Sequence, residues 1–251
     1  MAPLTASLIA DTASRTGVYT GPDNDRPHAV SAVDVEAGSA EITVTTGPAG
    51  HVTLGGTLNW LLKKPTIKRT WDGDTLKVHA QCNGFVDQFL QNCQIDLHLT
   101  VPPGVALTVH NGSGHIRVRD LTGPVDLTNG SGGMTLRALT GTLRATVGSG
   151  TIEATQLATP EAHLKAGSGT VRAEFTAPPR RADASAGSGS VDLTVPDGSH
   201  YRILGTPGSG ARIIDAGLAD PTSDRTLDVS SGSGSVTVGY PGWDFSSPPA
   251  G

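Results

Sequence analysis

The chain has 251 residues and a formal net charge of −5, with 33 glycines, 4% aromatic residues and 16% charged residues. The acidic balance and the lack of a long basic run argue against nucleic acid as a partner. Aliphatic residues alternate with polar ones over most of the chain, which excludes a disordered protein and predicts a loop-rich, all-β fold.

Residues 1–29 are expected to be an N-terminal tail. The slightly apolar start, from Met1 to Ala10, is too short to span a bilayer. It also lacks the basic start, the long apolar core and the small-residue cleavage site of a secretory signal. We therefore expect no membrane span and no export signal in the given chain.

Residues 30–100 are predicted to form an N-terminal β cap. Apolar and polar residues alternate at 30–35, 42–44, 75–78 and 95–99, as they do in half-buried strands. Asp72-Gly73 is a hairpin signal directly before the third of these runs. A stacked β domain exposes unpaired strand edges at its ends, and a cap of this kind would cover them.

The cap contains the only two cysteines of the chain, Cys82 and Cys93. They flank a turn at Asn83-Gly84 and are predicted to form a disulfide, which the loop-entropy model values at about 3 kcal/mol. A structural disulfide indicates an oxidising compartment. Because no export signal is visible, we interpret the conflict as an export or anchor segment upstream of the given chain. The alternative is a reduced, buried pair in a cytoplasmic protein, and no histidine pair stands at the spacing of a zinc site.

A second feature of the cap combines aromatic and basic residues. Together they could contact a glycan, a phosphate-rich polymer or a membrane surface. The interpretation that we prefer is a cap strand whose lysine stems cover apolar neighbours, because four cations fall short of a polybasic patch. The candidate ligand surface comprises Trp60, Lys63, Lys64, Lys68, Arg69 and Trp71.

Residues 101–239 carry a repeat. The tripeptide Gly-Ser-Gly occurs seven times, at steps of 18, 18, 19, 20, 21 and 24 residues, and a degraded eighth copy stands at Gly38-Ser39-Ala40. A fixed period near twenty is the signature of a solenoid. The seven copies open with Gly112-Ser113, Gly130-Ser131, Gly148-Ser149, Gly167-Ser168, Gly187-Ser188, Gly208-Ser209 and Gly232-Ser233.

A strand precedes and follows each copy. Apolar residues stand three and five positions after the serine, as at Ile116 and Val118, and six and four positions before it, as at Leu107 and Val109. One rung is therefore a strand, a turn, a second strand and then Gly-Ser-Gly. Stacking rungs at about 4.8 Å would bury one apolar core. This predicts a single-chain β-solenoid, similar to a parallel β-helix, with about 18–24 residues per rung.

The Gly208 copy departs from this pattern, because Arg212 stands where an aliphatic residue is expected. We expect its strand to be shifted by one residue, so that Ile213 or Ile214 turns inward. The Gly-Ser-Gly copies themselves are interpreted as corner geometry with a small polar ladder, rather than as a ligand site. Residues 240–251 are expected to form an aromatic plug, from Tyr240 to Phe245, and a polar tail.

The sequence shows no clear catalytic or metal-binding motif. None of the Gly-Ser-Gly copies has the spacing of a nucleophile elbow or of a phosphate loop, and the eight histidines form no metal-ligand pattern. The strongest candidate pair is Glu153 and Asp192, two rungs and roughly 9.6 Å apart, near the upper limit for an inverting glycosidase. Arg172 stands between them, so a ladder of alternating charge is the simpler explanation. We expect no catalytic residue, no metal and no cofactor.

At this point the chain resembles a known group. The repeated Gly-Ser-Gly, the turns at Val101-Pro102-Pro103-Gly104 and Val195-Pro196-Asp197-Gly198, and the cysteine pair ahead of the first repeat are similar to the bacterial putative-adhesin β-solenoid family. This is a domain of unknown function that is common in actinobacteria. The resemblance covers residues 30–240. It implies a β-solenoid outside the cell, often beside a membrane anchor, and it carries no catalytic residues.

Three hypotheses about function follow. The first is a non-enzymatic, adhesin-like binding or scaffold module of the cell envelope, because solenoids offer long regular faces to a partner. The second is a self-assembling structural solenoid similar to bactofilins, which the expected caps speak against. The third is a polysaccharide-active enzyme that uses Glu153 and Asp192. We expect a monomer at an extracytoplasmic or cell-surface location, with its partner, a cell-surface glycan or a protein, left open.

Overall fold

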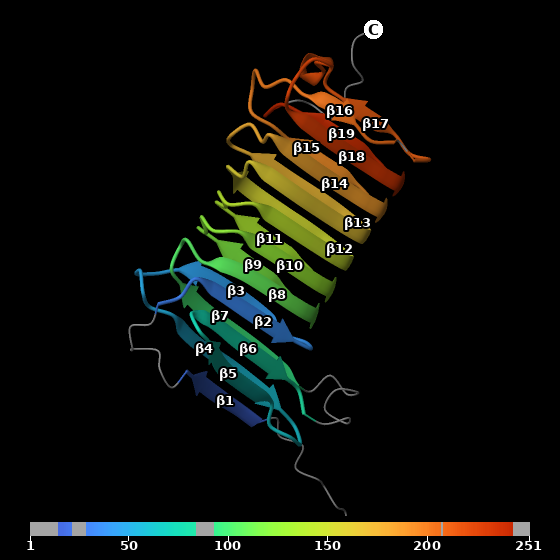
Figure 1. Cartoon of the computed structure of the whole chain (residues 1–251). Helices are drawn as coiled ribbons and strands as arrows, with labels where there is room; N and C mark the ends of the chain where they lie inside the picture. Colours follow the sequence, from blue (N-terminus) through green and yellow to red (C-terminus); the bar gives the residue numbers. More distant parts are fainter. Residues whose placement is uncertain (1–14, 22–28, 84–92, 207, 243–251) are drawn as a thin grey trace, which may run out of the picture.

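The computed structural model describes residues 15–21, 29–83, 93–206 and 208–242. Over these ranges the protein is all-β, with a single 3-10 turn, η1 (Ala216–Leu218), in the C-terminal part (Figure 1). None of the described residues forms a helix of the length and apolarity that would cross a membrane. The predicted all-β class is confirmed.

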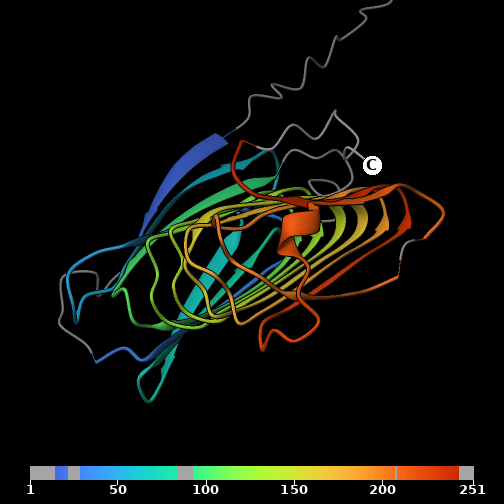
Figure 2. The ribbon, with the colours of Figure 1, turned by 90° about the horizontal axis from the view of Figure 1, so that it is seen from above.

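The described strands belong to one continuous sheet, which winds into a flattened coil (Figure 2). β12 and β13 run unbroken around the corner of this coil, and we call the two faces before and after the corner sheet 1 and sheet 2. Sheet 1 has the spatial order β5 (Thr66–Asp72), β6 (Thr75–Gln81), β2 (Ala32–Ala37), β8 (Ala106–Ser113), β10 (Val125–Ser131), the first part of β12 (Leu143–Leu157), the first part of β13 (Glu161–Phe175), β14 (Arg181–Ser188), β18 (Thr226–Ser233) and β16 (Arg202–Leu204). Sheet 2 has the order β1 (Arg15–Thr20), β4 (Thr53–Trp60), β7 (Gln94–Val101), β3 (Glu41–Thr46), β9 (Ile116–Arg119), β11 (Met134–Arg137), the second parts of β12 and β13, β15 (Val191–Thr194), β19 (Val236–Gly239) and β17 (Arg212–Ile214).

The apolar positions of successive rungs stack into one core between the two sheets. Leu107, Val125 and Leu143 are paired in parallel register, and each is at most 3% exposed. The same alternation that the repeat shows in the sequence therefore turns every second side chain inward. Because one rung cannot bury its own apolar side chains, the core forms only when rungs stack.

The Gly-Ser-Gly copies form the corner at which the chain passes from sheet 1 to sheet 2. A Cβ atom on Gly148 would lie 2.5 Å from the carbonyl oxygen of Gly130 in the rung below, which leaves no room for a side chain. Gly150, the third residue of the same copy, has a φ of +139°, a conformation that L-residues rarely adopt. The two glycines are therefore explained by close backbone approach and backbone geometry.

Two buried asparagines line the inner side of this corner. Asn129 donates from Nδ2 to the carbonyl oxygen of Gly114 at 2.9 Å, and its Oδ1 accepts from Asn111 at 3.3 Å. Asn111 also donates to the carbonyl oxygens of Ala40 and Ser113. Later rungs have Val147 and Ala166 at the same register position. The hydrogen bonds of these two asparagines therefore link neighbouring rungs in the N-terminal half.

The C-terminal rungs do not stack in chain order. β18 and β19 pair directly with β14 and β15, while β16 and β17, which precede them in the chain, lie outside them at the end of the stack (Figure 1). Gly232 accordingly packs against Gly187, and Gly208 packs against Gly232. The last strands of the repeat are thus inserted as the second rung from the end.

The N-terminal half contains an equivalent insertion. The degraded copy at Gly38 belongs to a rung, β2 and β3, that lies between β6–β7 and β8–β9. Strands β5, β4 and β1 then complete this end in antiparallel pairing. Residues 15–20, which the sequence analysis places in a tail, form β1 on the edge of sheet 2. The hairpin predicted at Asp72-Gly73 joins β5 to β6.

The one-residue shift expected for the Gly208 copy is wrong. Arg212 pairs with Val236 and Ile214 with Val238, so the register of the repeat is kept. Ile214 packs against the core without a shift, whereas Arg212 is exposed and donates to the carbonyl oxygen of Leu204 at 3.1 Å. Arg212 is tolerated at an inward position because, within the described residues, no strand stacks beyond its rung.

The described part of the C-terminal end is closed by side chains of three segments. Tyr201 and Leu218 are fully buried, Tyr240 packs against the core, and η1 lies across the end of the coil (Figure 2). The Tyr240 hydroxyl donates to the carbonyl oxygen of Ser199 at 2.9 Å. Two of the aromatic residues of the predicted plug, Trp243 and Phe245, lie outside the described residues. At the other end Cys82 and Cys93 are joined by a disulfide, with their Cα atoms 6.1 Å apart.

Candidate functional site

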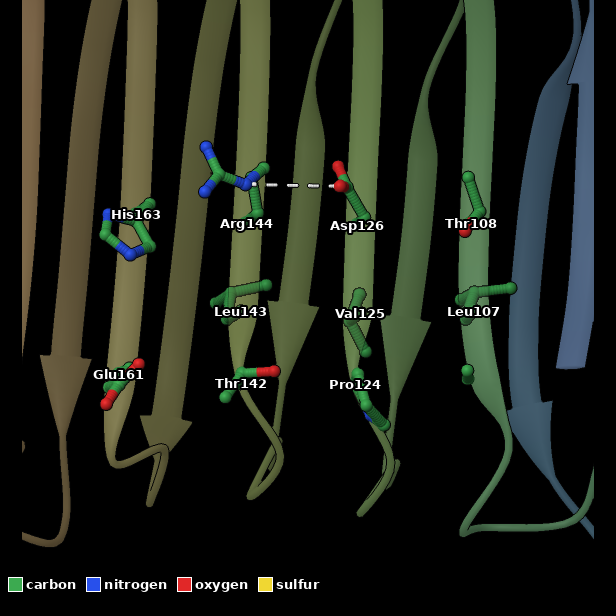
Figure 3. A pocket seen from close by; sticks show the side chains of 11 residues that line it. Leu107, Thr108, Pro124, Val125, Asp126, Thr142, Leu143, Arg144, Glu161 and His163 are labelled. Atoms are coloured by element: carbon green, nitrogen blue, oxygen red, sulfur yellow. Dashed lines mark ion pairs between the residues drawn. The ribbon is translucent and has the colours of Figure 1, made fainter. Parts of the chain in front are cut away.

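The outward positions of the strands form polar rows that run along the stack. In parallel register, equivalent outward residues of successive rungs lie side by side at about 4.8 Å. On sheet 1 one such row contains Thr108, Asp126, Arg144 and His163, from β8, β10, β12 and β13. Two positions earlier, a second row contains Pro124, Thr142 and Glu161 at the starts of the strands (Figure 3).

A groove of about 330 Å³ lies between these two rows, and it is the candidate functional site (Figure 3). Its floor is the backbone of Leu107, Val125 and Leu143, whose side chains face the core. The groove crosses four strands, so it is roughly 14 Å long by strand spacing. We call it the sheet 1 groove.

Charged side chains in and beside the groove pair across the strands. Arg144 Nε lies 4.0 Å from Asp126 Oδ2, and His163 Nδ1 lies 2.8 Å from Asp183 Oδ2. Asp183 also accepts from Arg181 at 3.0 Å. Because Arg144 and Asp126 are both at least half exposed, water screens their attraction and a ligand can compete for either one.

The groove offers hydrogen-bond donors and acceptors in alternation along its length. Arg144 donates only, Asp126 and Glu161 accept, and the hydroxyls of Thr108 and Thr142 can do both. This combination suits an uncharged or mixed polar ligand better than a strongly charged one. No group of three or more potential metal ligands occurs among the described residues.

The candidate ligand surface expected in the cap is divided in the structure. Trp60 and Trp71 pack against the core, and Trp71 lies opposite the buried Leu76. Lys64 Nζ lies 5.6 Å from the ring centre of Trp60. Lys63 is exposed in the loop after β4.

The basic residues of β5 project to opposite sides of sheet 1. Arg69 lies opposite the buried Val78 and 5.5 Å from the ring centre of Trp71, on the inner side. Lys68 lies opposite His79, on the outer side. Alternation within one strand therefore separates these two cations, and the six residues do not share one face.

The acidic pair considered for catalysis is interrupted by a cation. Glu153, Arg172 and Asp192 are direct neighbours on β12, β13 and β15, and Arg172 Nη2 lies 3.6 Å from Asp192 Oδ2. The guanidinium occupies the strand between the two carboxylates, where an inverting glycosidase would need an open space for substrate and water. The strand register therefore shows the predicted ladder of alternating charge.

The sheet 1 groove was not predicted as a site from the sequence. Its residues stand five and seven positions before the repeat serines, and their rows are visible once the copies are aligned on those serines. The signal is weak because outward positions of any solenoid are polar. Only the coordinates show that the two rows leave a hollow between them.

Comparison with known proteins places the chain in a family. The family model described as Toastrack DUF4097 matches residues 32–238. None of the curated proteins compared with the chain matches it.

Similar solved structures include a putative cell adhesion protein from Clostridium sporogenes, with 10% identity, coverage of 91% of this chain and 100% of that one, and a TM-score of 0.39. A putative adhesin from Bacteroides fragilis has 15% identity, coverage of 91% and 97%, and a TM-score of 0.42. A lipid binding protein from Parabacteroides distasonis, also named as putative, has 12% identity, coverage of 91% and 98%, and a TM-score of 0.33. Likeness at this level carries no argument about function.

Proposed function

This chain belongs to the Toastrack DUF4097 family, and we propose that it is a non-enzymatic, adhesin-like binding module that acts outside the cytoplasm, in the cell envelope. In this proposal the ligand is an extended polar polymer, such as a cell-surface glycan, that lies along the sheet 1 groove.

The proposal rests on the direction of the groove. It runs along the stack and crosses β8, β10, β12 and β13, so it presents equivalent positions at each rung. A polymer that lies in it meets a donor or acceptor at every step of about 4.8 Å. A compact small molecule would occupy only one or two rungs of such an open surface.

The disulfide supports the location. Cys82 is 6% exposed and packs in the core, and the bond to Cys93 closes the loop that follows β6. Bonds of this kind form and persist in oxidising compartments and are rare in the cytoplasm.

The experiment is a binding screen against bacterial cell-wall and capsular polysaccharides. Arg144→Ala should weaken binding about tenfold or more, since a hydrogen bond to a charged group contributes about 1.5–3 kcal/mol and each 1.4 kcal/mol is tenfold in affinity. Arg172→Ala, an equally exposed arginine on sheet 2, is the matched control and should bind as the wild type does. Equal binding by both variants, or a loss only with Arg172→Ala, would refute the sheet 1 groove as the site.

End-to-end assembly, the second function considered, is less well supported. The edge strands at the C-terminal end, β16 and β17, have three residues each, and very short edges are one way in which β proteins resist pairing with another chain. Light scattering over a range of protein concentrations distinguishes the two functions, because filament growth at micromolar protein would favour assembly.

A further inference from the structure

A second groove lies on the outer surface of sheet 2 and contains three arginines. Arg117 and Arg119 project from β9 and Arg137 projects from β11, around a hollow of about 280 Å³ that Thr43 and Thr135 also line. We call this the arginine groove. It is unusual in a chain with a net charge of −5.

Two of these arginines face one another across neighbouring strands. Arg119 and Arg137 are direct partners in the parallel register of β9 and β11, so their Cα atoms lie about 4.8 Å apart on the same face. Like charges directly opposite one another on a sheet destabilise it. The pair therefore favours any anion that binds between the two guanidinium groups.

Other like-charged neighbours of the coil are compensated by the protein itself. Asp183 and Asp228 are also direct partners, on β14 and β18, but His163 and Arg181 both contact Asp183. Within the described part of the chain, Arg119 makes no ion pair and no side-chain hydrogen bond. The compensating charge for Arg119 is thus not supplied by its own sheet.

The other two arginines are held in position by neighbours. Arg137 donates from Nε to Gln156 Oε1 at 3.0 Å, and Arg117 Nη1 lies 2.9 Å from Glu41 Oε2. These contacts fix the side chains while leaving the terminal Nη atoms of Arg137 available to a ligand. Glu41 neutralises Arg117, so the positive charge of the groove rests on Arg119 and Arg137.

We propose that the arginine groove binds a phosphate group between Arg119 and Arg137, beside Thr135, whose hydroxyl oxygen lies 2.8 Å from His115 Nε2. The planar forks of two guanidinium groups present paired N–H donors that match phosphate oxygens, and a rigid sheet presents them without reorganisation. The groove lies on the opposite sheet from the proposed polymer site. The inference therefore stands even if the polymer proposal fails.

The phosphate can come from three sources, and the experiment treats each as a separate arm. Binding of the full chain is measured by calorimetry with inorganic phosphate and with soluble polyphosphate, and by co-sedimentation with vesicles of phosphatidylglycerol against vesicles of phosphatidylcholine alone. We expect binding in at least one arm, abolished or weakened tenfold or more by Arg119→Gln and by Arg137→Gln. Arg172→Gln, an exposed arginine of the same sheet that pairs with Asp192, should change it less than twofold.

A second measurement follows the thermal midpoint. Without ligand, Arg119→Gln should match or exceed the wild type, because it removes a like-charge contact. With the ligand found in the first experiment, only the wild type and Arg172→Gln should gain in midpoint. The inference is overturned if none of the three arms shows binding, or if binding is the same in Arg119→Gln and Arg137→Gln as in the wild type.

Discussion

Ser233 lies in register with Ser188 on the neighbouring strand, although the repeat copy that contains Ser209 separates them in the chain. The last repeat has therefore entered the stack ahead of the one before it. The outermost rung at this end, β16 and β17, is joined through the chain, before and after it, to strands that lie deeper in the stack. β2 and β3 are inserted in the same way near the other end.

The inserted rung can be tested with engineered cysteines. Ser185 and Ser230 are direct outward partners on β14 and β18, at a separation that a disulfide can bridge. We expect Ser185→Cys/Ser230→Cys to form a cross-link during mild oxidation, detected by mobility on a non-reducing gel. Ser185→Cys/Thr206→Cys is the matched control, since rungs stacked in chain order would bring those two residues together. A cross-link in the control and none in the first pair would contradict the topology.

The first glycine of each Gly-Ser-Gly copy is expected to be required for stability where the backbones of neighbouring rungs are in contact. In Gly148→Ala the new methyl group would meet the carbonyl oxygen of Gly130, and such overpacking costs about 1–3 kcal/mol. Gly38→Ala is the control, because Gly38 holds the same place in the degraded copy and a Cβ there meets nothing within 4 Å. Urea denaturation of both variants measures the difference. Equal loss of stability in the two would count against close approach as the reason for the glycine.

The buried asparagine ladder should contribute to stability. Asn129→Ala removes the donor to the Gly114 carbonyl oxygen, and it takes from the buried Asn111 one of its three acceptors. We expect a loss of about 1–3 kcal/mol in the free energy of unfolding. Thr128→Ala, at the exposed neighbouring position, should change it by less than about 0.5 kcal/mol. An unchanged Asn129→Ala protein would show that the ladder is energetically neutral.

The stability of the protein should depend on pH through the ionisation of Asp96. Partial burial, and then the neighbouring carboxylate of Glu41, raise the pKa of Asp96 above its usual 3.8. The folded protein therefore binds this proton more tightly than the unfolded chain does, so stability falls as the pH rises from 3.8 through the raised pKa. Above that range the ionised side chain remains unfavourable.

Asp96→Asn is accordingly expected to be more stable than the wild type at pH 7, by about 0.2–1 kcal/mol, the size of a cross-strand like-charge contact. The difference should shrink as the pH is lowered toward 3.8. Thermal melts at several pH values measure it, and Asp126→Asn, which loses a pairing with Arg144, is the control. A lower midpoint for Asp96→Asn at pH 7 would contradict the expected sign.

The disulfide should contribute to the stability of the N-terminal end. Cys82→Ser/Cys93→Ser is expected to lose about 3 kcal/mol, because the unfolded chain is no longer closed into a loop over a sequence separation of 11. Melting curves with and without dithiothreitol measure the effect. Reductant should lower the melting midpoint of the wild type and leave the midpoint of the double variant unchanged. A wild-type midpoint that does not change with reductant would contradict the expectation.

Much of the fold could be predicted from the sequence, and the reason is local. The alternation of apolar and polar residues shows which side chains turn inward, and it does so without knowledge of which rung lies next to them. Examples are Leu107, Val109, Ile116 and Val118. The resemblance to the adhesin-like family is confirmed by the family match over residues 32–238. β1 and β4 were missed because glycine and threonine weaken the alternation at Gly17, Gly55 and Gly56.

The candidate grooves could not be predicted in the same way. Asp126, Arg144 and Arg119 stand at outward positions that look alike in any polar strand, and a hollow between two rows depends on the sizes of side chains from several rungs. Two interpretations of Trp60 and Trp71 were open, a ligand surface shared with the lysines and, as the preferred one, a cap strand whose lysine stems cover apolar neighbours. Both tryptophans pack against the core, Trp60 from β4, which pairs antiparallel with β1 and β7, and Trp71 from β5, which pairs antiparallel with β6.

The inward residues of a rung and the glycines of its corner can be predicted from the sequence, because both depend on backbone geometry within a short stretch of chain. The order of the rungs, in contrast, depends on contacts between segments far apart in the chain. Copies such as those at Ser188, Ser209 and Ser233 offer nearly identical edges, so local chemistry cannot distinguish their partners. In the structure the outermost of the three is the rung with Arg212 at an inward position, where the side chain is exposed.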